Sequence, residues 1–329
     1  MSDFQNLSEK HYLFARKSIG DITHFEQLAG DASTRRYFRL KTESSSFILC
    51  VDTEANKSIS SFLKIQSLFL LNEIRVPHVF AVDEDAGFMI IEDLGDIHLE
   101  TYIFEKSKDD VVSAYKKAID ALVQIQAIRG DNVIPFNLFF DVEKLMFEFD
   151  FFIEHFLKSY LGAQVNDKKS LELRASFEKI AEALQVSSAF VTTHRDYHSR
   201  NIIINNGEVS IIDFQDARMG LPQYDLVSLL EDPYVSLQEE IKPQLRDYYF
   251  KIALEKKIIQ SDRAAFDRLY ILMAYQRLVK ALGTYGYMAA EKKKSNFIPY
   301  IEITTGNLNS FASKYSESEN SWILLKGLL

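Results

Sequence analysis

The sequence contains little cysteine, glycine, proline or positive charge, and each shortage excludes a class of protein. The single cysteine, Cys50, cannot form an internal disulfide, which fits a reducing compartment. With 12 Gly and 6 Pro in 329 residues, the chain is neither a linker array nor a repeat of short turns. The 38 Lys and Arg residues against 47 Asp and Glu residues give a net charge of −9, which argues against a nucleic-acid partner.

Long hydrophobic runs are missing as well. No apolar stretch reaches the roughly 18 residues that a membrane span needs. The first ten residues, MSDFQNLSEK, are polar and lack the hydrophobic region of a secretory signal. We therefore expect a cytoplasmic protein with no membrane span, and the sequence indicates no obligate protein partner. A hydrophobic content of 47%, with 25 Phe and 16 Tyr, is sufficient for a full, aromatic-rich core.

Hydrophobic periodicity divides the chain into a strand-rich part and a helical part. Before residue 94 it predicts one amphipathic helix over 59–69 and five strands, at 24–29, 35–40, 47–52, 78–83 and 87–93. After residue 97 it predicts helices over 111–128, 141–161, 168–185, 236–256 and 264–290. Candidate helix N-caps are Asp141, Ser170 and Asp262. Residues 312–321 are polar and predict a flexible tail, and the pattern does not decide where Trp322 docks.

The strongest chemical signal interrupts the helical part. His194-Arg195-Asp196 is followed by Asn201 and, twelve residues later, by Asp213 in Ile-Ile-Asp-Phe. The β-type triplets Ile-Ile-Ile at 202–204 and Ser-Ile-Ile at 210–212 flank an Asn-Asn-Gly turn and predict a β-hairpin. Phosphoryl transfer needs one carboxylate to deprotonate the attacking hydroxyl, and a carboxylate and an amide oxygen to hold Mg²⁺. The hairpin delivers these groups at its two ends, and the alternative is a surface loop in which Asp and Asn merely form turns.

The order of these parts indicates a protein-kinase-like enzyme. A strand-rich lobe comes first, then a short connector, then a helical lobe that carries the motif. A connector of this kind presents backbone N–H and C=O groups to an adenine edge. We expect Glu92, Asp93 and Leu94 in that role, and the alternative is a solvated hairpin end.

Several segments resemble the aminoglycoside/choline phosphotransferase superfamily. They are 194–201, 211–216 and Tyr224-Asp225-Leu226. Segments 29–40, 91–96 and 276–283 are similar to one branch, the bacterial cell-wall sugar kinases that phosphorylate N-acetylmuramate and N-acetylglucosamine at the anomeric position. The motifs extend over most of the chain, and only the last forty or so residues lack a match.

The resemblance implies roles for individual residues. Asp196 would be the catalytic base, and Asn201 and Asp213 would hold Mg²⁺. Gly30, Asp31, Ala32, Ser33 and Thr34 would cover the ATP phosphates through backbone N–H groups. Asp225 would tie the catalytic loop to the following helix, and His194 is expected to be structural.

Four residues are candidates for binding the acceptor substrate. His198 either lines the acceptor pocket or bonds a carbonyl. Asp216 either binds a sugar hydroxyl or caps a helix. Gln276 and Arg277 either lie near the acceptor pocket or occupy an exposed helix face.

One departure from the general kinase pattern is the third strand, which has no lysine. Most kinases place a lysine there against the α- and β-phosphates, whereas this strand ends in Cys50-Val51-Asp52. We hypothesise that Arg35 or Arg36 replaces it, because both follow the predicted phosphate turn. Lys64 is the next candidate, and the alternative is that the two arginines lie on an exposed strand face.

These observations predict an α+β, two-lobed protein-kinase-like fold with a small antiparallel-sheet N-lobe and a larger, mostly helical C-lobe. The expected boundaries are 1–93 for the N-lobe, 94–97 for the hinge, 98–311 for the C-lobe and 312–329 for the tail. The expected activity is ATP- and Mg²⁺-dependent phosphorylation of a small-molecule sugar, an N-acetylated amino sugar, at its anomeric hydroxyl. The alternatives are a kinase of another small alcohol, such as an aminoglycoside or choline, and a nucleotide-binding pseudokinase.

Overall fold

The computed structural model describes residues 9–28, 35–52, 58–131, 133–235 and 237–329. Its contacts divide the chain into two compact units. The first unit takes in the chain up to His98 together with residues 202–216, and the second takes in residues 99–201 and 217–329. The hairpin segment after Asn201 therefore packs with the N-terminal strands, although it lies in the middle of the helical sequence. The boundaries expected from sequence remain a prediction.

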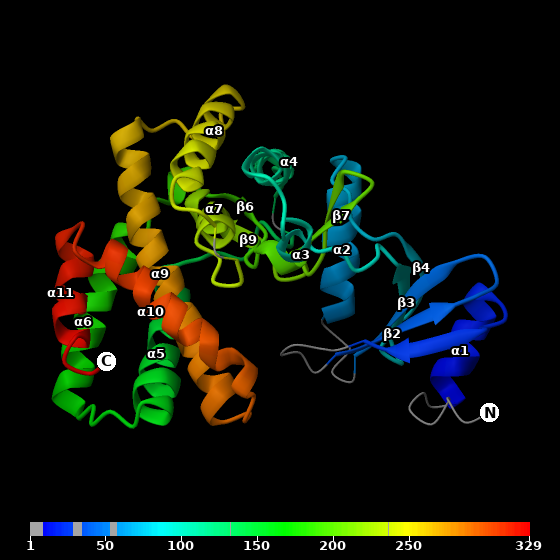
Figure 1. The fold of residues 1–329 in the computed structure, drawn as a ribbon, viewed down its shortest axis with the longest axis horizontal. Helices are drawn as coiled ribbons and strands as arrows, with labels where there is room; N and C mark the ends of the chain where they lie inside the picture. The colour runs from blue at the N-terminus through cyan, green and yellow to red at the C-terminus, as the bar shows by residue number, and fades with distance from the viewer. Residues whose placement is uncertain (1–8, 29–34, 53–57, 132, 236) are drawn as a thin grey trace. The chain divides into compact units, whose positions relative to one another are not determined.

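The first unit is built on an antiparallel sheet, which has five strands within the described residues in the order β1-β2-β3-β5-β4. The strands are β1 His24–Gln27, β2 Arg36–Lys41, β3 Ser46–Val51, β4 Val79–Asp83 and β5 Phe88–Glu92. Each begins and ends close to a predicted run, so the strand prediction is confirmed. Helix α1 (Glu9–Ile19) precedes the sheet in the chain, and α2 (Ser58–Leu71) lies between β3 and β4. Figure 1 shows α1 beside the sheet at the N-terminal end.

The core of this sheet forms from alternate residues of the central strands. Phe38 and Leu40 of β2 and Leu49 and Val51 of β3 belong to one buried cluster that also includes Ala15 of α1. Side chains alternate between the two faces of a strand, so this spacing puts one face against α1. The β-branched and aromatic residues at these positions suit a half-buried pleated surface.

The hairpin of the first unit consists of β7 (Ile202–Asn205) and β8 (Glu208–Ile211), as the sequence predicts. Asn206 and Gly207 have φ of 50° and 80°, the left-handed geometry that tight hairpin turns require. Phe214 packs at 4.8 Å and 5.4 Å between ring centroids against Phe62 and Phe69 of α2. These aromatic contacts fasten the segment after β8 to α2, which lies beside β7 in Figure 1.

The second unit is mostly helical. Its elements, as far as the structure describes the chain, are α3 Leu99–Tyr102, α4 Lys108–Ala127, α5 Val142–Phe152, a π-helix at Ile153–Tyr160, α6 Asp167–Ala183, α7 Gln223–Leu230, α8 Ile241–Glu255, α9 Arg263–Ala290, α10 Ile298–Ala312 and α11 Ser316–Leu325. Short 3₁₀ turns lie at Ser187–Ala189, Ser199–Asn201 and Ser295–Phe297, and strands β6 (Val191–Thr193) and β9 (Arg218–Gly220) pair antiparallel.

Helix starts follow the expected capping chemistry at two of three predicted positions. Asp141 and Asp262 accept backbone N–H groups at 2.7 Å and 2.8 Å and are confirmed as N-caps. Ser170 is wrong, because α6 begins earlier and Asn166 caps it by accepting the N–H of Lys169 at 3.0 Å.

Helix α9 approaches α5 and the π-helix closely because two of its residues lack a side chain. A Cβ at Gly283 would lie 3.0 Å from the Cα of Phe152, and one at Gly286 would lie 2.8 Å from the Cα of Phe156. Larger residues at these positions would push the helices apart. This spacing also sets how α5 and α9 present their polar side chains to each other.

The prediction of a flexible tail over 312–321 is wrong. The segment after Ala312 forms α11, which packs against α6 and α9. Its buried face consists of Ser318, Ser321, Trp322 and Leu325. Ser321 Oγ donates to the hydroxyl of Tyr275 at 2.8 Å, so a polar residue is buried without losing its hydrogen bond. A hydropathy pattern cannot recognise a helix face that is built in this way.

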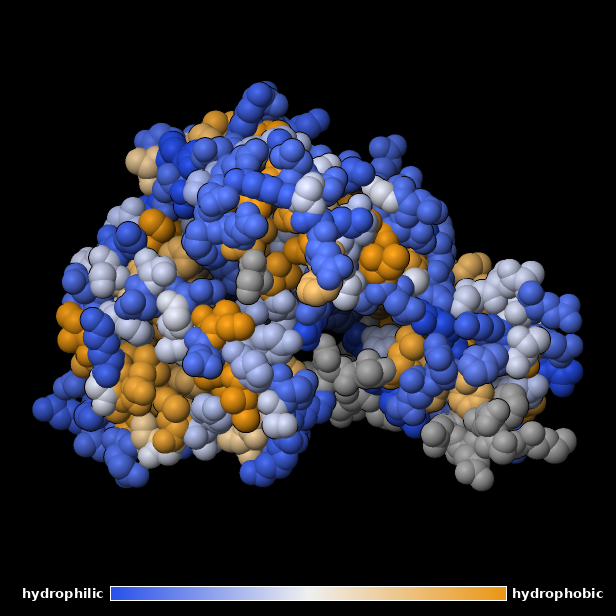
Figure 2. Space-filling view, in the orientation of Figure 1, coloured by the Kyte–Doolittle hydropathy of each residue, from blue (hydrophilic) through white to orange (hydrophobic). Residues whose placement is uncertain are grey.

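The surface has hydrophilic and hydrophobic regions. In Figure 2 hydrophilic residues cover the region of α8, whereas hydrophobic residues gather in the region of α5, α6 and α11. None of the helices in the described ranges is long and apolar enough to cross a membrane.

Candidate active site

The loop that carries Asp196 is held by a buried carboxylate from α7. Asp225 accepts the backbone N–H of His194 at 2.6 Å and that of Arg195 at 3.0 Å. Arg195 has φ of 85°, a conformation that a residue with a side chain rarely adopts, and the two bonds hold it there. Burial raises the pKa of Asp225 to about 7 against the opposing effect of these hydrogen bonds. The contact agrees with the structural role that the resemblance implies for Asp225.

A second buried carboxylate, which the sequence analysis missed, holds the other end of the loop. Asp232 accepts the backbone N–H groups of Ser199 at 2.8 Å and of Tyr234 at 2.9 Å. Burial raises its pKa to about 6, and hydrogen bonds oppose that shift. The only signal in the sequence is its place soon after Asp225 at the end of α7, which by itself fits an ordinary helix terminus.

The carboxylate of Asp196 forms an ion pair with a lysine from a distant helix. Lys280 Nζ of α9 lies 3.3 Å from Asp196 Oδ1, and the two side chains are 21% and 28% exposed. Burial disfavours the ionised carboxylate, but Lys280, Arg195 and Arg277 outweigh it and hold the pKa of Asp196 well below its usual range. Asp196 is therefore ionised at neutral pH, as a proton acceptor must be.

The two predicted residues of α9 lie in the same region. Arg277 Nη1 donates to the hydroxyl of Tyr224 at 2.6 Å and to the carbonyl of Arg195 at 3.3 Å. Gln276 is fully buried and donates to Glu148 of α5 at 2.8 Å. The alternative of an exposed helix face is therefore wrong. Lys280, which the sequence analysis did not choose as a site residue, lies one turn further along the same face.

The two histidines of the motif differ in their surroundings. His194 is fully buried, and its Nδ1 accepts the backbone N–H of Asp196 at 3.3 Å, which fits a structural residue. His198 lies edge-on to the ring of Tyr234, at 5.3 Å between centroids. Burial, with Arg277 and Lys280 adding to it, lowers the pKa of His198 to about 3, although Asp196 opposes the shift. The His198 ring is therefore neutral at physiological pH.

The oxygen atoms of Asn201 and Asp213 suit a hard cation. Asn201 donates its amide Nδ2 to the carbonyl of Asp196 at 2.9 Å, which leaves its amide oxygen as the acceptor. Asp213, an exposed residue of the first unit with φ of 62°, accepts from Gln215 at 2.9 Å through one carboxylate oxygen. Carboxylate and amide oxygens are the ligands that Mg²⁺ prefers. Within the part of the chain that the structure describes, no group of three or more His, Cys, Asp or Glu side chains is arranged to hold a metal ion.

In the first unit Arg35 and Arg36 have different environments. Arg35 Nε donates to Asp52 at 3.0 Å, and the two side chains are 15% and 4% exposed. Arg36 is exposed, and its guanidinium lies over the ring of Phe38. Lys64 on α2 is exposed as well. Tyr37 interacts electrostatically with both Arg35 and Asp213. Arg35 is therefore the arginine that shares its surroundings with Asp213.

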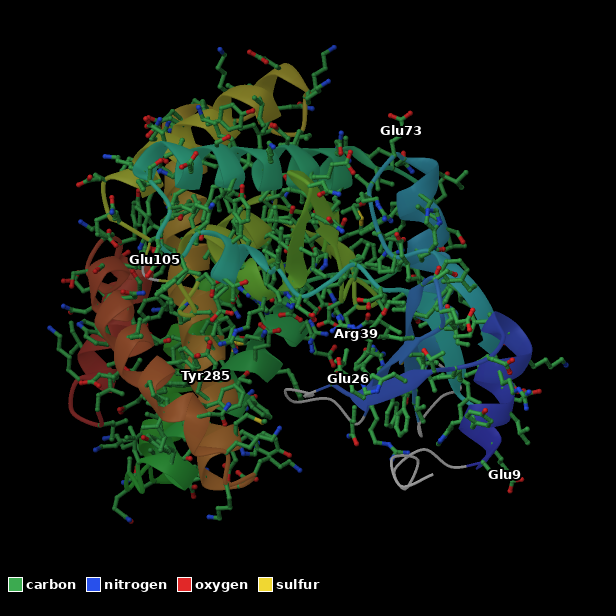
Figure 3. All side chains as sticks on the ribbon, turned by 45° about the vertical axis from the view of Figure 1, so that its right-hand side comes forward. Glu9, Glu26, Arg39, Glu73, Glu105 and Tyr285 are labelled. Carbon is green, nitrogen blue, oxygen red and sulfur yellow. The ribbon has the colours of Figure 1, made fainter. Side chains whose placement is uncertain are left out.

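The predicted adenine-binding connector is anchored by its acidic side chains. Glu92 forms a two-pronged ion pair with Arg75, one contact of which is 2.7 Å long. Arg39 grips Asp93 and Asp96 through contacts of 2.6–3.0 Å. Figure 3 shows Arg39 next to Glu26 of the neighbouring strand, which lies 3.5 Å away. Leu94 is buried, so the connector has a defined conformation.

Two predictions are left without a structural test. Asp216 is exposed, and the next regular element is strand β9, so the alternative that it caps a helix is wrong. Its binding of a sugar hydroxyl remains a prediction. The predicted phosphate turn, residues 30–34, lies outside the described residues.

Comparison with known proteins identifies the family. A family profile described as "Phosphotransferase enzyme family" matches residues 24–266. The chain belongs to this family. The predicted superfamily and enzyme class are thereby confirmed, and the chain is a phosphotransferase.

Curated relatives of this phosphotransferase carry one name. An N-acetylmuramate/N-acetylglucosamine kinase of Neisseria meningitidis is 30% identical over 306 residues, 92% of this chain and 89% of that protein. A protein of the same name from Pseudomonas putida is 28% identical over 275 residues, 82% of this chain and 78% of that protein.

Solved structures confirm the fold. An ADP-bound aminoglycoside phosphotransferase is similar with a TM-score of 0.63 at 18% identity, covering 93% of this chain and 99% of that one. A choline kinase from Streptococcus pneumoniae has a TM-score of 0.62 at 15% identity, covering 92% of this chain and 99% of that one. This phosphotransferase thus has the predicted two-lobed, protein-kinase-like α+β fold.

Proposed function

We propose that this phosphotransferase is an ATP- and Mg²⁺-dependent kinase that phosphorylates N-acetylmuramate and N-acetylglucosamine at the anomeric hydroxyl. The observation that carries the proposal is Asp196, an ionised carboxylate on a loop that Asp225 and Asp232 hold at both ends. Relatives at 27–30% identity, named for these two sugars, support the choice of acceptor. The single buried cysteine fits the cytoplasmic location that the sequence predicts.

In this proposal Asp196 accepts the proton of the acceptor hydroxyl. The hydroxyl oxygen forms a bond to the terminal phosphorus of the donor, and the bond from that phosphorus to the ADP oxygen breaks. Asn201 donates its amide N–H to the carbonyl of Asp196 and so helps to fix the loop. A base of this kind contributes roughly 10²–10⁴-fold to the rate.

Asn201 and Asp213 would hold Mg²⁺ through their oxygen atoms. The metal would neutralise charge on the phosphates and orient them for transfer. Asp213 would offer carboxylate oxygens, one of which accepts from Gln215, and Asn201, whose amide nitrogen is engaged, would offer its amide oxygen. The backbone of residues 30–34 would cover the phosphates.

Arg35 is proposed to supply the positive charge that the missing lysine supplies in other kinases. Arg35 directly precedes β2 and Asp52 directly follows β3, and the pairing of Arg36 with Val51 brings the two residues together. The planar guanidinium fork is suited to phosphate oxygens, and the ion pair with Asp52 fixes the orientation of that fork. Its shared neighbour Tyr37 links it to Asp213, the proposed metal ligand.

The connector is proposed to bind adenine through backbone groups of Glu92, Asp93 and Leu94. The side chains of Glu92 and Asp93 are engaged by Arg75 and Arg39. A carboxylate that is held in an ion pair does not compete with adenine for the backbone N–H groups of the connector. This arrangement supports backbone recognition rather than a solvated hairpin end.

The charge around Asp196 favours a neutral or anionic acceptor over a cationic one. Burial raises the pKa of Asp196, but the nearby cations Lys280, Arg195 and Arg277 lower it by more. Positive charge therefore surrounds the carboxylate. Aminoglycosides and choline carry positive charge themselves and would be repelled here. N-acetylation removes the charge of an amino sugar, which makes N-acetyl hexosamines compatible with this site.

A panel of acceptors tests the proposal. We expect ADP release from ATP and Mg²⁺ with N-acetylmuramate and N-acetylglucosamine, and no stimulation by choline or kanamycin. Preferential turnover of a cationic acceptor would reject the sugar assignment. Nucleotide binding without turnover of any acceptor would favour the pseudokinase alternative.

A further inference from the structure

Helices α5 and α9, which pack against each other, each carry two charged residues near their contact. Lys144 and Glu148 lie one turn apart on α5, and Arg277 and Lys280 lie one turn apart on α9. The buried hydrogen bond from Gln276 to Glu148 joins the two helices directly at this level. The close approach at Gly283 and Gly286 fixes the spacing of the helices just beyond it.

Positive charge exceeds negative charge in this region. The charged groups with the largest effects on Lys144 and Lys280 are the cations Arg195, Arg218 and Arg277 and the carboxylates Glu148 and Asp196. Adding the two lysines themselves gives five cations against two carboxylates. Counting Asp225, which interacts with Arg277, as fully ionised still leaves an excess of positive charge.

Two of the cations have unused binding capacity. Lys144 forms no ion pair within the described residues, and its ammonium lies 4.6 Å from the centroid of the Phe147 ring. Arg277 Nε is buried without a hydrogen-bond partner in the described part of the chain. Burial lowers the pKa of both lysines, and for each of them the neighbouring arginines add to this effect. A partly buried excess of positive charge is costly unless an anion joins it.

We propose that Lys144, Arg277 and Lys280 form a binding site for an oxyanion beside Asp196. The oxyanion is either a carboxylate on the acceptor or the phosphoryl group in transfer. Both carry oxygen atoms that ammonium and guanidinium groups bind through charge-assisted hydrogen bonds. N-acetylmuramate carries a carboxylate and N-acetylglucosamine does not, so the two proposed acceptors differ in the group that such a site would recognise. This inference rests on the proposed function for its substrates but not for the site itself.

Kinetics with both sugars distinguish the two sources of the oxyanion. The variants are Lys144→Met and Lys280→Met, with Lys144→Arg as the conservative replacement and exposed Lys251→Met on α8 as the matched control. For a carboxylate site, Lys144→Met raises KM for N-acetylmuramate by about tenfold and leaves N-acetylglucosamine unchanged. For a phosphoryl site, kcat falls by about tenfold for both sugars while their KM values stay constant. In either case Lys144→Arg restores most of the loss.

Calorimetric titration with inorganic phosphate, without nucleotide or sugar, tests the site when no sugar is turned over. We expect wild type and Lys251→Met to bind phosphate equally, and Lys144→Met and Lys280→Met to bind it about tenfold more weakly. Circular dichroism verifies that each variant is folded. Where sugars are turned over, kinetic constants of both Met variants within twofold of the control overturn the inference. Where no sugar is turned over, the inference is overturned if all variants bind phosphate with equal affinity or if wild type does not bind phosphate.

Discussion

Two cation–carboxylate pairs, one in each unit, differ in how open they are. Arg35 and Asp52 lie 3.0 Å apart with 15% and 4% of their side chains exposed, whereas Lys280 and Asp196 lie 3.3 Å apart with 21% and 28% exposed. The first pair joins adjacent strands, and the second joins segments 84 residues apart. In the first pair the carboxylate is sealed and orients the cation. In the second pair the carboxylate is accessible, and cations outnumber it.

The comparison indicates that the two pairs have different roles. A sealed carboxylate cannot accept a proton from a substrate, so Asp52 serves Arg35, which we propose as the phosphate-binding group. An accessible carboxylate that is ionised at neutral pH can accept a proton, and the ion pair with Lys280 holds Asp196 in that state and in position. The predictions below break one pair or the other, or the packing that positions it.

The largest effect is expected from Asp196→Asn. The amide keeps the size of the side chain but accepts no proton, so kcat falls by about 10²-fold or more. The dissociation constant for ATP stays nearly the same, because Asp196 does not hold the nucleotide in this proposal. Steady-state kinetics and calorimetry measure the two effects. Near-full turnover of the variant would remove Asp196 from the mechanism.

Loss of the proposed metal ligand should act on binding instead. In Asp213→Ala the metal loses its carboxylate, and Mg²⁺-dependent nucleotide binding should be abolished. Asn201→Ala should lower the rate less than Asp213→Ala does, because a neutral amide contributes less than a carboxylate to holding a cation. Calorimetric titration of ATP with and without Mg²⁺ makes the measurement. Wild-type binding of Mg-ATP by Asp213→Ala would refute this placement of the metal.

Breaking the sealed pair should affect the nucleotide more moderately. Arg35→Ala is expected to lower kcat/KM for ATP by about tenfold, which corresponds to about 1.4 kcal/mol. Arg36→Ala is the matched control, since Arg36 is exposed on the same strand and should change kcat/KM for ATP by less than twofold. Equal effects of the two substitutions, or none, would shift attention to Lys64.

The smallest effect concerns the packing that brings α9 to α5. A Cβ at Gly286 meets backbone atoms of the π-helix, so Gly286→Ala should lower the free energy of unfolding by about 1–3 kcal/mol. Gly306 on α10 has no atom within 4 Å of an added Cβ, so Gly306→Ala should stabilise the protein by up to about 1 kcal/mol. Denaturant titration compares the two variants. Similar stability changes of the same sign would show that α9 does not need glycine there.

Local features of the molecule were predictable from sequence. The strands, the β7–β8 hairpin and the caps Asp141 and Asp262 follow from periodicity and turn chemistry that neighbouring residues determine. The motif residues could be chosen because phosphoryl transfer constrains their types and spacing. Arg35 and Asp52 could be brought together by strand pairing alone.

Features that depend on tertiary packing were not predictable. Lys280 reaches Asp196 only because α9 returns to the loop, and Lys144 comes from a third segment. Asp232 differs from a common helix-end residue only through the backbone N–H groups that it accepts. Helix α11 was not predicted because its buried serines donate their hydroxyl groups to nearby carbonyls and to Tyr275 of α9, whereas a hydropathy scale counts serine as exposed.

The most direct test of the proposed function is the structure of the product. Wild-type protein is incubated with ATP, Mg²⁺ and N-acetylmuramate, and the product is analysed by ³¹P NMR. The proposal predicts an acid-labile glycosyl phosphate whose phosphorus couples to the anomeric proton. A 6-phosphate as the main product, or no turnover of any N-acetyl hexosamine, would contradict the assignment while leaving the phosphotransferase family intact.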